Sequence, residues 1–157
     1  MRKRLIEETK ENRLSIAPTG WLKVEELAEV EISSEDAQHP IESALLTGGN
    51  GWRAADPGQQ TIRLLFVQPQ LLHRIRVCFV ETTVQRTQEY LLRWSGDAGH
   101  SFREIVRQQW NFSPEGSVTQ TEEHRVDLSG VTVLELIITP DIGNEHAVAS
   151  LAELRIA

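Results

Sequence analysis

The chain has 157 residues, 39% hydrophobic and 25% charged, which is an ordinary composition for one globular domain with its own hydrophobic core. Its formal net charge of -7 repels phosphate backbones and so argues against a nucleic-acid partner. Cys78 is the only cysteine, which excludes an intramolecular disulfide. Because it lies within an apolar run, we expect a small buried side chain and a reducing compartment.

The first 20 residues are polar and lack a clear period, so we predict an N-terminal arm over 1–20 and a single domain over 21–157. Basic residues at positions 2–4 resemble the start of a signal peptide, but glutamates from Glu7 onward interrupt the apolar segment that should follow. No stretch has the length and apolarity of a membrane span. We therefore expect a cytoplasmic protein with no membrane partner.

The first third of the domain predicts two short helices around one strand. Residues 23–28 suggest a short helix or turn, and 28–33 alternate between apolar and polar as a strand does. A second short helix is predicted over 42–46, with Pro40 near its start, where the missing N–H is tolerated, and Gly48 and Gly49 at its end.

The sequence of the rest of the domain predicts strands. Segments 61–67 and 74–80 alternate on either side of a turn at Pro69, and segments 124–128 and 131–139 flank a turn at 129–130. Segment 131–139 is apolar on both faces, which is typical of a central strand, and 149–156 forms the last strand. About eight short strands favour an antiparallel β-sandwich or jelly roll.

A hairpin over 88–110 gives the clearest local signal. Tyr90, Leu92 and Trp94 alternate along its first strand, the glycines at 96 and 99 supply the turn, and Phe102 resumes the apolar pattern. We expect Trp94 and Phe102 to lie in the core.

Three segments resemble the discoidin, or coagulation-factor type C, family. They are the glycine-rich turn over 44–52 that ends in Trp52, the hairpin over 92–105, and the closing strand over 149–156 with its Leu-Ala-Glu sequence at 151–153. The resemblance covers most of 21–157. It implies an all-β fold, a galactose-binding-like antiparallel β-sandwich or jelly roll of about eight strands. This fold hosts sugar, lipid and protein binders, so it does not fix a ligand.

Sugar-binding relatives place polar side chains on loops at one end of the sandwich. The resemblance puts their acidic residue at Glu35 or Asp36, an arginine near Arg86, and Arg53 where the relatives have a histidine. The relatives' stacking aromatic is absent near positions 56–57. A sugar presents hydroxyls for hydrogen bonds and an apolar face for an aromatic ring. We therefore predict a ligand site formed by Asp36, Arg53, Arg86, Trp110 and Asn111, with Phe112 as a second substitute ring.

Structural alternatives remain open for these residues. Asp36 and Arg86 are equally consistent with a surface ion pair, Arg53 with a brace at the sandwich end, and Trp110 and Phe112 with a hydrophobic plug. Trp52 is expected in the core.

Many relatives also bind a structural calcium through oxygens of the glycine-rich turn and the glutamate of the last strand. Here Glu153 is present, but Thr47 stands where the relatives usually have aspartate, and Asn50 offers an oxygen without charge. Calcium prefers six to eight oxygen ligands. We therefore expect no cofactor, with a calcium site at Thr47, Asn50 and Glu153 as the alternative.

No catalytic constellation emerges from the sequence. The histidines lack metal-ligand spacing, no serine lies in a nucleophile elbow, and the glycine-rich turn lacks the lysine of a phosphate-binding loop. We predict a non-catalytic module that binds carbohydrate or a related small polar ligand. The alternative is a protein–protein interaction module of a cytoplasmic complex or a homo-oligomer, which the expected compartment and the missing stacking ring favour.

Overall fold

The computed structural model describes residues 20–157, so the predicted arm lies outside the described residues except for Gly20. Strands dominate the chain and two four-residue helices interrupt them near its start. In chain order the elements are α2 (Val24–Leu27), β1 (Ala28–Ile32), α3 (Glu42–Leu45), β2 (Trp52–Pro57), β3 (Gln60–Val80), β4 (Arg86–Ser95), β5 (Arg103–Phe112), β6 (Thr119–Thr139), β7 (Val148–Leu151) and β8 (Glu153–Ile156).

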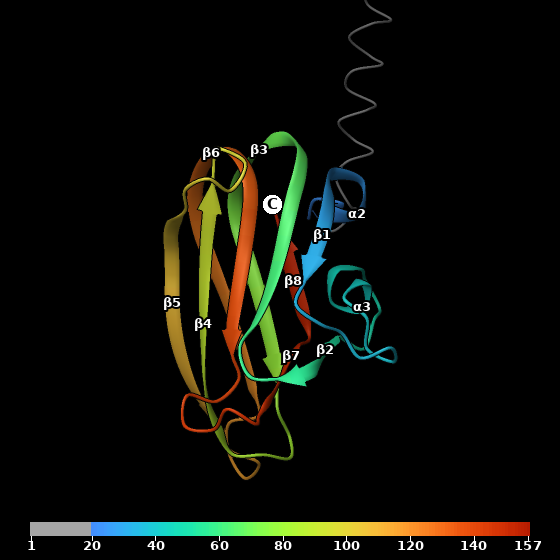
Figure 1. Cartoon of the computed structure of the whole chain (residues 1–157), viewed down its shortest axis with the longest axis vertical. Coiled ribbons are helices and arrows are strands. Elements are labelled where there is room, and N and C mark those ends of the chain that lie inside the picture. The colour runs from blue at the N-terminus through green and yellow to red at the C-terminus, as the bar shows by residue number, and fades with distance from the viewer. Residues whose placement is uncertain (1–19) are drawn as a thin grey trace, which may run out of the picture.

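Two long strands, β3 and β6, run antiparallel to each other and arch together over one end of the molecule (Figure 1). Their pairing shifts register three times between Leu65 and Arg74 of β3, which is where the arch bends. The halves of each strand therefore belong to two facing layers. We call this end of the molecule the arched end, and the opposite one, where the long connections gather, the loop end.

The larger layer is ordered β1, first half of β3, second half of β6, β4 and β5. The smaller layer is formed by β8, the second half of β3 and the first half of β6. Every pairing is antiparallel. A separate two-stranded ribbon, β2 with β7, lies near the loop end.

The core lies between the layers because alternate side chains of each strand point inward. Buried residues come from both, and the rings of Phe79 in β3 and Tyr90 in β4 meet with centroids 5.3 Å apart. Tyr90 Oη also lies 2.7 Å from Nε2 of His124 in β6, so a polar contact crosses the core beside the apolar ones. The predicted all-β antiparallel sandwich is confirmed.

Several boundaries differ from the sequence prediction. The turns predicted at Pro69 and at 129–130 are bends within the continuous strands β3 and β6, where Gly130 adopts a φ of 72°. Strand β2 was not predicted, and the predicted last strand is divided at Ala152 into β7 and β8. Cys78 is only half-buried, contrary to prediction, because its side chain points away from the core. Its sulfur accepts a hydrogen bond from Thr121 Oγ1 at 3.3 Å.

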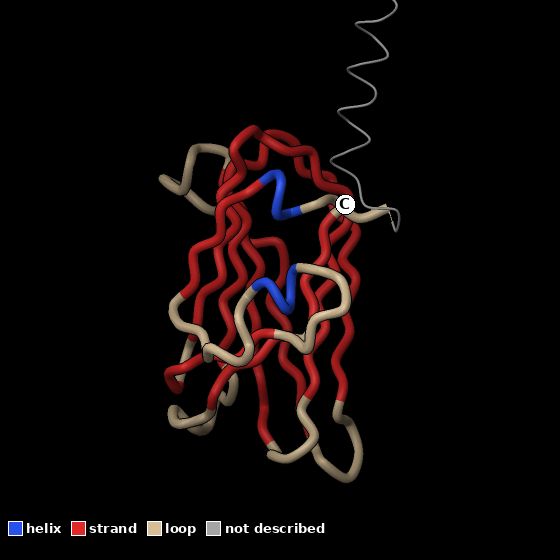
Figure 2. Tube along the Cα trace, turned by 90° about the vertical axis from the view of Figure 1, so that its right-hand side faces the viewer, coloured by secondary structure: helices blue, strands red, loops and turns tan. Residues whose placement is uncertain are grey.

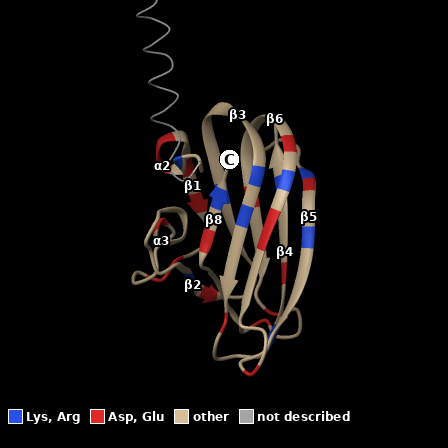
Figure 3. Ribbon diagram, turned by 180° about the vertical axis from the view of Figure 1, so that it is seen from behind, with Lys and Arg blue, Asp and Glu red and all other residues tan. Residues whose placement is uncertain are grey.

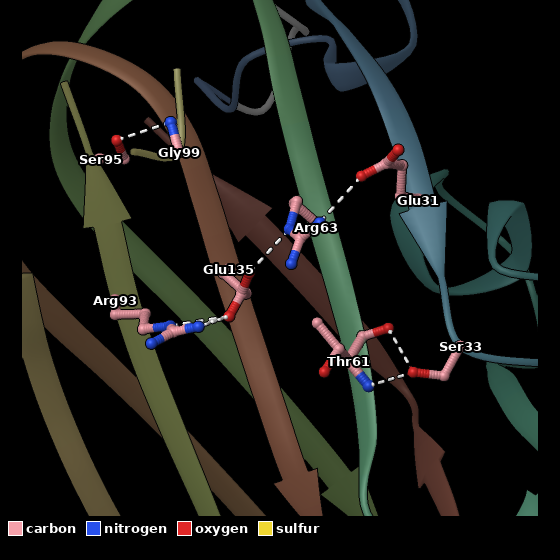
Figure 4. A network of polar contacts seen from close by, with 8 residues as sticks. All are labelled: Glu31, Ser33, Thr61, Arg63, Arg93, Ser95, Gly99 and Glu135. Carbon is pink, nitrogen blue, oxygen red and sulfur yellow. Dashed lines mark hydrogen bonds and ion pairs between the residues drawn. The ribbon is translucent and has the colours of Figure 1, made fainter. Parts of the chain in front are cut away.

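Charged side chains form a row across the outer face of the larger layer (Figure 4). Glu135 of β6 has a side chain only 1% exposed, enclosed between Arg63 and Arg93. Arg63 Nε donates to its Oε2 and Arg93 Nε to its Oε1, each at 2.7 Å, and Arg63 also donates to Glu31 at 3.1 Å. Arg93 stacks on the ring of Phe102 at 4.2 Å. Phe102 therefore lies outside the core, half-buried under Arg93, contrary to the prediction that it is a core residue. Trp94 is also half-buried, but it packs against the core.

The glycine-rich turn packs closely because its glycines have no side chains. A Cβ at Gly49 would lie 2.2 Å from the carbonyl oxygen of Ser43, and Gly51 adopts a φ of 86° beside Leu151. The turn thereby joins α3 to the β2–β7 ribbon. Both helices lie on the same side of the sandwich (Figure 2). Within residues 20–157, no helix has the length and apolarity needed to cross a membrane.

Candidate functional site

A polar cleft opens at the loop end, with a volume of about 370 Å³. We call it the loop-end cleft. Its walls come from the connections before and after α3, the start of β2, the end of β3 with the residues after it, and the β7–β8 junction. It is lined by His39, Asn50, Gly51, Trp52, Arg53, Val80, Glu81, Thr82, Thr83, Ser150, Leu151 and Ala152.

One wall brings Asp36, His39 and Arg53 together through backbone hydrogen bonds. Asp36 N donates to Arg53 O at 2.8 Å, and Arg53 N donates to His39 O at 3.1 Å. The Asp36 carboxylate accepts from Gln38 N at 3.0 Å and lies 3.8 Å from His39 Nδ1. Arg53 is exposed, and its side chain has no hydrogen-bond or ion-pair partner among the described residues. Two of the predicted ligand residues, Asp36 and Arg53, are therefore neighbours.

The opposite wall is organised around Glu81. Its Oε1 accepts from Arg86 Nε at 2.7 Å, while its Oε2 accepts from both the backbone N and Oγ1 of Thr83 at 3.2 Å. Burial raises the pKa of the Glu81 carboxyl, but the hydrogen bonds from Arg86 and Thr83 outweigh it and hold the pKa below its ordinary value. The cleft thus contains a carboxylate that stays ionised and is held in one orientation.

Arg86 lies behind Glu81 and does not line the cleft. Its side chain is 1% exposed, and its Nη1 donates to Pro140 O at 2.7 Å and to Gln88 Oε1 at 2.9 Å. The guanidinium also stacks on Phe112 at 4.8 Å. The structure therefore changes the expected role of Arg86: burial prevents direct ligand contact, and its ion pair is with Glu81 instead of Asp36.

Trp110 and Asn111 do not line the cleft either. They belong to β5, an edge strand of the larger layer, where Trp110 is opposite Gln88 and Asn111 opposite Thr87. Trp110 packs against the core, and its enclosed Nε1 has no hydrogen-bond partner within the described structure. The exposed Asn111 accepts from Thr87 Oγ1 at 2.7 Å. Phe112 is fully buried. The positions of Trp110 and Phe112 therefore match the alternative of a hydrophobic plug better than that of an aromatic ring beside Arg53.

The lining of the cleft presents no exposed aromatic face. Trp52 is 1% exposed, as the sequence predicts for a core residue, and its Nε1 donates to Ser34 O at 3.1 Å. The apolar surface comes instead from Val80, which is 43% exposed. Recognition in this cleft therefore depends on hydrogen bonds and charge more than on stacking.

The predicted calcium ligands do not fit a calcium ion. Arg155 donates from Nη1 to Ala44 O at 2.7 Å and from Nη2 to Leu46 O at 3.1 Å, so a guanidinium already binds carbonyls of the glycine-rich turn. Arg155 Nε also lies 3.8 Å from Glu153 Oε1, and an acidic and a basic segment are both visible on β8 (Figure 3). Over residues 20–157, no cluster of His, Cys, Asp and Glu suits a metal. A fixed cation beside Glu153 opposes the entry of a second one.

Two other depressions are less suited to a ligand. A shallow groove of about 700 Å³ follows edge strand β1, but its charged residues Glu31 and Arg63 are already paired with each other. A smaller one beside Trp94, of about 220 Å³, contains Asp97, whose carboxylate is occupied by hydrogen bonds from Ser95 and Ser101. The loop-end cleft is the depression that combines a fixed carboxylate with an unpaired arginine.

Sequence reasoning missed His39, Glu81 and Thr83. His39 carries no motif, and it reaches the cleft only because its backbone pairs with Arg53. Glu81 and Thr83 follow directly after an apolar strand and belong to no motif. A polar cluster at the end of a buried strand was the only available signal.

No family model matches the sequence, and neither does any curated protein. Solved structures do match. A family 32 carbohydrate-binding module from NanJ of C. perfringens, in complex with galactose, aligns with a TM-score of 0.59 and 19% identity over 85% of this chain and 95% of that one. A module of the same family, from a family 31 glycoside hydrolase of Clostridium perfringens, aligns with a TM-score of 0.61 and 16% identity over 87% and 93%.

A chitosan-binding module from a Paenibacillus chitosanase/glucanase aligns with a TM-score of 0.56 and 15% identity over 83% of this chain and 94% of that one. Such identities show a shared fold, while membership of the discoidin family stays a prediction. The chain therefore has the galactose-binding-like β-sandwich fold seen in family 32 carbohydrate-binding modules.

Proposed function

We propose that this protein is a non-catalytic carbohydrate-binding module whose ligand occupies the loop-end cleft. The observation that carries the proposal is the Glu81 carboxylate, which lies in a concave, polar cleft and is held ionised by Arg86. A fixed acceptor of this kind binds sugar hydroxyls without the cost of ordering a flexible side chain.

The rest of the lining complements Glu81. Arg53, Asn50 and Thr82 supply donors to the oxygens of a polyol, and the Thr83 hydroxyl accepts while it donates to Glu81. Neighbouring hydroxyls on a sugar ring each donate and accept, so a site with both kinds of group at short range suits them. This lining also favours a sugar over a protein partner, since the centres of protein interfaces are enriched in aromatic and apolar groups.

The carboxylate count supports a binding role instead of hydrolysis. Glycoside hydrolases generally use a pair of carboxylates on either side of the scissile bond. Among the residues that line the cleft, Glu81 is the only acidic one. Several solved neighbours are carbohydrate-binding modules in complex with sugars, including galactose, which agrees with the same role.

The proposal is tested by titrating galactose and N-acetylgalactosamine into the protein while recording backbone amide shifts. We expect shifts at His39, Arg53 and Thr83, and loss of binding in Glu81→Gln and in Thr83→Val, which leaves the Glu81–Arg86 pair intact. Glu104→Gln, an exposed acid on β5, is the matched control and should bind like the parent. Absence of shifts with both sugars and with their acidic counterparts, or unchanged binding in both cleft variants, overturns the proposal.

A further inference from the structure

One charged side chain in the lining of the cleft has no partner. Glu81 is neutralised by buried Arg86, and the Asp36 carboxylate is directed to Gln38 N and His39. Arg53, by contrast, lines the cleft with no acceptor for its guanidinium among the described residues. Among the residues that line the cleft, Arg53 therefore carries the one charge without a partner, and the Asp36 carboxylate on the same wall lies outside the lining.

The missing aromatic face makes this charge more important. Sugar sites gain much of their affinity from stacking a ring of the protein on the apolar face of the sugar. Here Trp52 is buried and Val80 provides the exposed apolar surface. A neutral sugar offers no charge to pair with Arg53, so it is held by hydrogen bonds that contribute modestly against competing water.

Arginine at this position matches one ligand group in particular. A guanidinium offers two parallel N–H donors to a planar carboxylate, and charge-assisted pairs of this kind are shorter and stronger than neutral ones. The net negative charge of the protein repels acids at long range, so an acidic ligand has to be recognised locally. Arg53 is the lining residue that supplies this local recognition.

We infer that the loop-end cleft prefers acidic sugars, with the carboxylate of a hexuronate bound by Arg53 and its ring hydroxyls bound by Glu81 and Thr83. This inference rests on the proposed function and adds the ligand class to it. Arg53 then determines specificity, whereas Glu81 contributes to the binding of neutral and acidic sugars alike.

The test compares galacturonate, its methyl ester and galactose by calorimetric titration of the whole chain. The ester keeps the shape of the acid and removes its charge. We expect galacturonate to bind about tenfold more tightly than the ester or galactose. Arg53→Gln should abolish this preference, because it weakens the binding of galacturonate more than that of the two neutral ligands, and Arg53→Lys should restore part of it. Because Arg53 is exposed, both variants are expected to fold normally.

Arg125→Gln is the matched control, since Arg125 is an exposed arginine on the smaller layer outside the cleft and its loss changes the net charge equally. It should retain the preference. Equal affinity for acid and ester, or a preference that survives Arg53→Gln, overturns the inference and leaves the proposed function standing. Failure of all three ligands to bind the parent overturns both.

Discussion

Arg86 and Glu81 form an ion pair of 2.7 Å beneath the cleft, with side chains 1% and 17% exposed, respectively. A charge at such depth is stable only while its partner is present, because the unpaired ion keeps its desolvation cost. The pair therefore links the orientation of a ligand-binding carboxylate to the stability of the domain.

Arg86→Met should lower the free energy of unfolding by about 3 kcal/mol, since it leaves the Glu81 carboxylate without its buried partner. Urea denaturation followed by tryptophan fluorescence measures the change. The double variant Glu81→Gln/Arg86→Met should recover part of the loss, because neither charge is then left alone. Equal stability of Arg86→Met and the parent would show that the pair has no such role.

Glu135→Ala should also destabilise the domain by about 3 kcal/mol, because it leaves Arg63 and Arg93 facing each other over a buried position. Glu31→Ala removes an exposed carboxylate from the same row and should cost less than about 1 kcal/mol. Comparing the two urea midpoints checks the prediction. Similar costs would mean that burial of Glu135 does not matter.

Stability should fall as pH drops below about 6.5, partly through His124. Burial lowers the pKa of His124, and the neighbouring Glu122 carboxylate offsets this only in part. The unfolded chain then binds a proton at higher pH than the folded one, so folding is favoured above the unfolded pKa and loses this contribution as pH falls through the folded pKa. Tyr90 Oη lies 2.7 Å from Nε2 of His124, and once the ring is protonated this nitrogen can only donate to it.

Thermal midpoints recorded from pH 7.5 to 5.5 test this dependence. His124→Gln should flatten this decline slightly, because the imidazole is only partly buried. His73→Gln, at an exposed position on β3, should leave the slope unchanged. An identical slope in His124→Gln and the parent would contradict the assignment.

Arg155→Gln should lower the free energy of unfolding by about 1–3 kcal/mol, because two carbonyls of the glycine-rich turn lose a charged donor. Millimolar calcium should leave the Tm of the parent unchanged. Arg76→Gln, which lies 3.9 Å from Glu153 and is 40% exposed, is the matched control and should have a small effect. A calcium-dependent rise in the parent Tm would restore the metal site that the sequence suggests.

The sequence predicts the sandwich well because its strands alternate clearly and its turn residues are conventional. It does not predict that β3 and β6 continue through Pro69 and Gly130, because the same residues that end a strand also permit it to bend. Whether a strand stops or arches depends on its partner, and that information is not local.

The site was predicted less completely, for reasons visible in particular residues. Asp36 and Arg53 lie side by side as a loop-end site requires. Arg86 was expected at the surface because charged residues are rarely buried without a partner, and its partner Glu81 lies five positions earlier with no motif to mark it. In the sequence Arg155 has no feature that distinguishes it from other strand residues. Only the fold shows that it donates to a carbonyl of the glycine-rich turn.

The arch of β3 and β6 has a consequence for how such a domain diversifies. An insertion within the arch would displace both layers at once, because the same two strands run through each. The connections at the loop end, such as 81–85 and 140–147, join strand ends and can lengthen without disturbing either layer (Figure 1). Changes in ligand preference can therefore accumulate around the cleft while the opposite end keeps the scaffold constant.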